Sequence, residues 1–176
     1  AVILQALIDE RGLSVGIASS AVSVFFLSSG VSGMWIAGLL ERYDVKLVIT
    51  AGAFAASSAL LAIRYVSDEW QLLSAYALFG VGFAASGLMS STTLITRWFA
   101  ARRALAMSIA STGLSIGGIL LTPSSALLIQ AQGIDLSVTV FALAYLIGVV
   151  PLALIFIKSR PTDVGLQIDG AAFAQA

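Results

Sequence analysis

Long apolar stretches separated by short polar corners run through the whole chain. A bilayer's hydrocarbon core of about 30 Å needs roughly 20 helical residues to cross it. We expect five such spans, at about 14–40, 45–64, 70–96, 104–130 and 136–157. Residues 1–8 are apolar but too short to cross. We interpret them as the end of a helix that begins earlier, with a short surface helix as the alternative.

Glycine and polar residues mark the predicted ends of these spans. Gly12 breaks the chain before Ser14, which can cap the first full span, and Gly133 with Asp135 marks the turn before the fifth. In hydrocarbon, backbone groups must be paired within a helix or a closed barrel. The apolar runs are about twice the length of a barrel strand and do not alternate. The predicted fold class is therefore all-α, a polytopic membrane helical bundle.

The composition is typical of a membrane protein and argues against several other classes of protein. The chain is 59% hydrophobic and 10% charged, with a mean hydropathy of +1.02, whereas soluble domains carry about 25% charged residues. Its net charge of zero gives no reason to expect a nucleic-acid partner. It holds no Cys and no His, so the usual metal ligands, thiol nucleophiles and proton shuttles are missing. We expect no cofactor and no enzymatic activity.

The basic residues predict an orientation in the membrane. Connections after the first, third and fifth spans hold seven of the nine Lys and Arg residues, namely Arg42, Lys46, Arg97, Arg102, Arg103, Lys158 and Arg160. The other connections hold Arg11 and Arg64. Because cytoplasmic loops are enriched in Lys and Arg, the fifth span should end in the cytoplasm. We expect an integral membrane protein. No charge lies at the centre of a span, so a charged group that binds an ion or solute lies outside this chain.

Small and hydroxyl residues recur within the spans. Small residues at helical spacing let backbones approach closely, and on this ground we assign helix packing to Gly33, Ala37, Gly80, Gly82, Gly113 and Gly117. Hydroxyl residues concentrate in the third and fourth spans, where Ser86, Ser90, Thr93, Ser111 and Ser115 could line a polar pathway. The alternative is that each hydroxyl bonds only to the preceding turn of its own helix.

Four segments together resemble the major facilitator superfamily. The segment 37–46 resembles the signature loop between helices two and three, with Arg42 and Lys46 at its basic positions, Glu41 in place of an Asp and Asp44 in place of a Gly. The segment 97–106 resembles the loop between helices four and five. The segments 111–118 (with Pro123 beyond) and 160–170 resemble helix five and the sequence after helix six. These matches are most similar to the bacterial monocarboxylate and oxalate/formate branch.

Two departures argue against a drug/proton antiporter. The helix-four motif of proton-coupled antiporters carries an Arg where this chain has Tyr76, and the helix-five motif has Gly-Pro where this chain has Gly117 and Gly118. Both departures leave the solute open.

The resemblance implies the amino-terminal half of a twelve-helix transporter. Residues 1–160 would form helices two to six plus the end of helix one, and 161–176 the start of the cytoplasmic loop that joins the halves. The implied function is secondary transport of a small organic anion, a mono- or dicarboxylate, by alternating access. The implied partners are the solute, the lipid bilayer and a missing carboxy-terminal half. A structural or sensory membrane module that transports nothing is the alternative.

The same resemblance assigns roles at one membrane face. A conformational-gating loop would comprise Glu41, Arg42, Asp44, Lys46 and Arg97, and would meet the other half at the cytoplasmic face. We expect Glu41 to pair with Arg97 or with Arg42.

Overall fold

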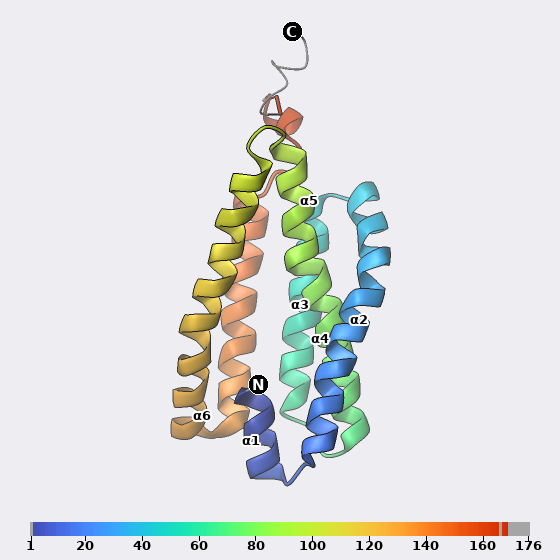
Figure 1. The fold of residues 1–176 in the computed structure, drawn as a ribbon. Coiled ribbons are helices and arrows are strands. Elements are labelled where there is room, and N and C mark those ends of the chain that lie inside the picture. Colours follow the sequence, from blue (N-terminus) through green and yellow to red (C-terminus); the bar gives the residue numbers. More distant parts are fainter. Residues whose placement is uncertain (1, 166, 169–176) are drawn as a thin grey trace.

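The computed structural model describes residues 2–165 and 167–168, and the secondary-structure elements within that range are all helices. Figure 1 shows them arranged as an elongated bundle. Four stretches are long and apolar enough to cross a membrane, and they confirm the all-α class. The elements are α1 (Val2–Arg11), α2 (Val15–Arg42), α3 (Val45–Ile63), α4 (Glu69–Ser86), α5 (Leu88–Trp98), α6 (Arg103–Phe156) and a short 3-10 turn (Pro161–Val164).

Helix α6 is two helices joined by a sharp bend. Gly133 has a φ of 75°, a left-handed conformation that glycine adopts without steric cost. The arms 103–132 and 134–156 lie beside each other in Figure 1 and carry the fourth and fifth predicted spans. At the start of α2, Ser14 accepts a hydrogen bond from the Ile17 N–H at 3.2 Å, so the predicted cap is confirmed.

The third predicted span is interrupted, which the sequence did not reveal. Gly87 has φ −100° and ψ −129°, and it separates α4 from α5. A Cβ at this position would lie 2.5 Å from the carbonyl oxygen of Phe83, so the break tolerates glycine alone. The Ser90 hydroxyl donates to the carbonyl of Ala85, which satisfies one of the groups that a helix end leaves unpaired.

Helix α4 lies between α2 and α3 and contacts both through glycine. A Cβ on Gly82 would lie 2.5 Å from the backbone nitrogen of Ala56 on α3, and one on Gly80 would lie 2.5 Å from the carbonyl oxygen of Phe25 on α2. A Cβ on Gly33 would meet Met89 at 3.2 Å. These helices therefore pack backbone against backbone, as small residues allow in membranes.

The other residues to which packing was assigned lie elsewhere. Ala37 is exposed, and no atom of the described chain beyond the helix's own backbone lies within 4 Å of a Cβ built on Gly113 or Gly117. A packing role for Ala37, Gly113 and Gly117 stays a prediction, and their packing partner would lie outside the described residues.

Two clusters of buried apolar residues lie within the bundle, one toward each end. The first joins α1, α2, α3, α4 and both arms of α6 around Leu7, Ile63, Leu72 and Val138. The second surrounds the α2–α3 corner and includes Leu40, Val45, Ile49, Ala84 and Ala153. In contrast, no residue between 103 and 128 is buried, so the described chain leaves most of the first arm of α6 uncovered.

Gly82→Ala should destabilise the bundle, because the added methyl group must push α4 away from the α3 backbone. We expect a loss of about 1–3 kcal/mol, as for other overpacked cores, seen as a lower thermal midpoint of the purified full-length protein in detergent. Gly148→Ala is the matched control, since Gly148 is exposed on α6 and has open space around it. Equal midpoints for the two variants would contradict close packing at Gly82.

Candidate functional site

The basic corners of the chain lie together at one end of the bundle. Figure 1 shows the α2–α3 corner, the α5–α6 corner and the segment after α6 at the same end. The α1–α2 and α3–α4 connections and the bend in α6 lie at the opposite end. Seven of the nine Lys and Arg residues therefore occupy one end, which we call the basic end.

Arg97 closes the end of α2. Its guanidinium donates a hydrogen bond to the carbonyl oxygen of Leu40, in the last turn of α2. A helix C-terminus has unpaired carbonyls and a partial negative charge, so a cation there is stabilising. The expected pairing of Glu41 with Arg97 or Arg42 is wrong, because within the described residues Glu41 has no ion pair within 4 Å. The backbone carbonyl takes the guanidinium in its place.

A cluster of hydrogen bonds around Ser159 connects the segment after α6 to the start of α3. The Ser159 hydroxyl donates to the Asp44 carboxylate and accepts from the Val45 N–H at 2.9 Å. Asp44 also caps α3 through the Lys46 N–H at 3.4 Å and forms an ion pair with the Lys46 ammonium at 3.3 Å. The segment after α6 is thereby attached to the first turn of α3. Sequence reasoning missed Ser159 because nothing local distinguishes it from other loop serines.

The carboxylate of Asp44 is held in its charged form. The hydrogen bond from Ser159 is the main cause that lowers the pKa of Asp44 below its usual 3.8, with Lys46 contributing and desolvation opposing. A lowered folded-state pKa stabilises the fold above the ordinary pKa of Asp. The contribution is therefore complete at neutral pH and is lost only as the pH falls through the folded-state pKa.

A tryptophan completes the connections at the basic end. The indole N–H of Trp98, the last residue of α5, donates to the carbonyl oxygen of Lys158 at 2.9 Å. Helices α2, α3 and α5 and the segment after α6 are therefore joined by hydrogen bonds at this end. Of the predicted gating residues, Asp44, Lys46 and Arg97 are bonded within the chain, while Glu41 and Arg42 are exposed.

The hydroxyls predicted to line a pathway fall into two groups. Ser86 bonds to the Tyr145 hydroxyl at 2.7 Å and to the Gly82 carbonyl, and Ser90 is fully buried beside the break at Gly87. Thr93 donates to the carbonyl of Met89. Ser111 and Ser115 lie exposed on the first arm of α6, where Ser115 donates to the Ser111 carbonyl.

Tyr145 is a polar residue that the sequence reasoning overlooked. It stands in the apolar second arm of α6, where a buried phenol usually has a hydrogen-bond partner. That rule could have singled it out, but its partner on α4 is 59 residues away in the sequence. Among the described residues, no group of three Asp, Glu, His or Cys residues is placed to hold a metal ion.

Ser159→Ala should loosen the α2–α3 corner, because the Val45 N–H would then be buried without a partner. We expect a cost of about 1–3 kcal/mol and faster hydrogen exchange in the first turn of α3 at pH 7. Ser67→Ala, in the exposed α3–α4 connection at the opposite end, is the control. Unchanged protection of Val45 would show that Ser159 does not hold the corner.

Comparison with known proteins identifies the family. The model of the Major Facilitator Superfamily matches residues 1–174. An uncharacterised MFS-type transporter, YcxA of Bacillus subtilis, is 23% identical over 81% of this chain and 35% of its own length. The MFS transporter asaE of Aspergillus flavus is 23% identical over 88% of the chain and 35% of its own length.

A third relative, an MFS-type transporter of Gibberella moniliformis, is 28% identical over 57% of this chain and 24% of its own length. No solved structure matches. The matches thus span between about a quarter and a third of the length of these curated relatives. From the family match over nearly its whole length, the chain belongs to the Major Facilitator Superfamily, whose members transport solutes across membranes.

Proposed function

We propose that this chain is the amino-terminal half of a secondary transporter that moves a small organic anion by alternating access, in a bacterial inner membrane with the basic end in the cytoplasm. Membership of the family supports transport of a solute. The alternating-access mechanism, the anionic solute and the second half are our inferences.

The proposal rests on which charged residues at the basic end are bonded within the chain and which are not. Asp44, Lys46 and Arg97 are satisfied within the chain, so they hold the α2–α3 corner in one shape. Glu41 is exposed and has no ion pair with another described residue. A corner that is internally rigid and offers an unpaired carboxylate is suited to bind a second body in one conformational state and release it in another.

The exposure of the first arm of α6 supports our inference that a second half of the transporter packs against it. None of its residues between 103 and 128 is buried, and Gly113 and Gly117 have open space before them. Lipid can cover one side of such a helix. Two glycines one turn apart are typical of a surface on which another helix packs closely, so we assign them to the contact with the missing half.

The hydroxyls beside the helix break are our proposed solute contacts in this half. Ser86 and Tyr145 present hydroxyls at the end of α4, where Gly87 interrupts the helix. Discontinuous membrane helices form solute sites because their unpaired backbone groups line a cavity. Hydroxyl donors can bind a carboxylate, but its countercharge must come from a helix outside this chain.

Glu41→Gln should reduce transport by the full-length protein without unfolding it. If Glu41 stabilises one access state through a charge pair, its loss shifts the equilibrium by about 1–3 kcal/mol, the usual range of coupling energies, and uptake changes about five-fold or more. Glu69→Gln, at the opposite end of the bundle, is the matched control and should transport normally. Wild-type uptake by both variants would remove Glu41 from the gate.

An uptake assay in proteoliposomes tests the solute class. We expect the full-length protein to catalyse saturable uptake of radiolabelled acetate, lactate or oxalate, and excess unlabelled anion to compete. Choline and glycerol serve as cationic and neutral comparison solutes. Uptake confined to these two would reject the anion assignment but leave the transport function in place, whereas no uptake of any solute would favour a structural or sensory module.

A further inference from the structure

A groove opens between α2 and α3 near the basic end. The two helices share a tight corner but diverge from it, and both pack on α4, which closes the gap from behind. The resulting space has a volume of about 380 Å³. Gly52, Gly82 and Ala85 form its floor, and Leu39, Tyr43 and Leu47 form its rim. We call it the α2–α3 groove.

The groove is chemically unlike the hydroxyl cluster at Ser86 and Tyr145. Every side chain that lines it is apolar except Tyr43 at its mouth. A polar solute would lose its hydration there without gaining hydrogen bonds, which is unfavourable. The lining therefore selects a hydrocarbon ligand.

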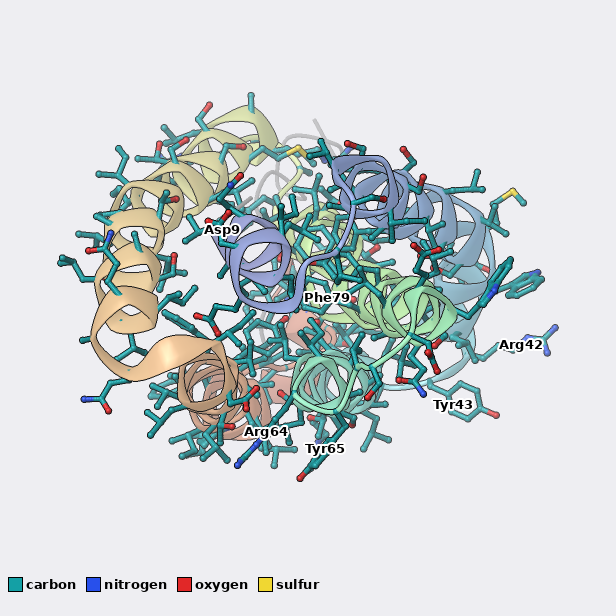
Figure 2. The ribbon with its side chains drawn as sticks, turned by 90° about the horizontal axis from the view of Figure 1, so that it is seen from below. Asp9, Arg42, Tyr43, Arg64, Tyr65 and Phe79 are labelled. Carbon is teal, nitrogen blue, oxygen red and sulfur yellow. The ribbon has the colours of Figure 1, made fainter. Side chains whose placement is uncertain are left out.

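A cation and an aromatic residue stand at the mouth of the groove. Figure 2 shows Arg42 and Tyr43 extending outward from the bundle on the same side. Lys46 is engaged by Asp44 at 3.3 Å, whereas Arg42 makes no hydrogen bond or ion pair with another described residue. Amphipathic aromatic rings and long basic side chains are typical of the level at which lipid headgroups lie.

The position of the groove favours a lipid over a helix of a second half. Figure 2 shows Arg42 and Tyr43 on one side of the bundle and the first arm of α6, which we assign to the contact with the missing half, on the opposite side. An apolar groove that opens away from that contact faces the bilayer, so an acyl chain can enter it.

We propose that the α2–α3 groove binds one acyl chain of an anionic phospholipid of the leaflet at the basic end, with the lipid phosphate bound by Arg42 and the Tyr43 hydroxyl. Charge-assisted hydrogen bonds from a guanidinium to phosphate are short and strong. The chain would lie against Gly52 and Gly82, where α3 and α4 touch, so the lipid braces the contact on which the bundle depends.

Photolabelling of the full-length protein tests this proposal. The protein is placed in phosphatidylcholine nanodiscs with a phosphatidylglycerol probe that carries a diazirine in its acyl chain, and the labelled peptides are mapped by mass spectrometry. We expect label concentrated in residues 36–55 and 81–85. Label spread evenly over the exposed apolar residues of α2 to α6 would overturn the proposal.

Filling the groove should abolish this pattern. Ala51→Phe places a ring in the groove from an exposed position on α3, and we expect labelling of these peptides to fall to background. Ala62→Phe is the matched control, because Ala62 is also exposed on α3 but does not line the groove. Equal labelling of the two variants would contradict an acyl chain at this place.

Removing the Arg42 cation distinguishes the contribution of the lipid headgroup to binding from that of the acyl chain. Arg42→Gln should lower labelling by the phosphatidylglycerol probe about five-fold, the effect of about 1 kcal/mol per basic residue near anionic lipid. Labelling by a phosphatidylcholine probe should change less. Arg103→Gln, a basic residue at another corner of the same end, should leave both unchanged. If wild-type protein shows no label and a cysteine at position 51 cross-links to another helix, a protein segment fills the groove and the proposal fails.

Discussion

The backbones of α2, α3 and α4 lie too close together for any side chain at Gly80 and Gly82. In hydrocarbon, burying apolar side chains gives little advantage over leaving them in lipid, so close packing must hold the helices together. The rest of the structure follows from this contact. With α4 fixed between its neighbours, α2 and α3 meet only near their shared corner, and their divergence leaves a groove on one side. The same contact fixes where the break at Gly87 lies relative to α6.

Polar groups at the basic end are satisfied by one another with few ion pairs. A guanidinium caps α2, a serine hydroxyl bridges a carboxylate and an N–H, and an indole N–H binds a carbonyl. Most of these bonds use a backbone group as one partner. The arrangement depends on helix ends as much as on charged side chains, and it leaves Glu41 and Arg42 available for contacts beyond this chain.

Much of the fold could be predicted from the sequence because membrane helices are specified locally. Span lengths, the cap at Ser14 and the bend at Gly133 follow from apolar length and from residues with particular backbone preferences. The break at Gly87 could not be predicted, since a glycine that allows close packing and one that interrupts a helix look alike in sequence. Gly80 and Gly82 do the first, and Gly87 does the second. The alternation of basic corners predicted which ends meet. It did not predict that Arg97 binds the Leu40 carbonyl, because helix ends compete with carboxylates for guanidinium groups.

Ser159 binds residues that precede it in the chain by 114 and 115 positions. During synthesis, α2 and α3 enter the membrane long before this serine leaves the ribosome. Until α6 has been made and has folded back, the Val45 N–H at their corner therefore lacks the Ser159 hydroxyl as its acceptor. The final hydrogen bond at this corner forms only on a complete set of helices, so a chain truncated within α6 retains an unfinished corner that quality-control proteases can attack.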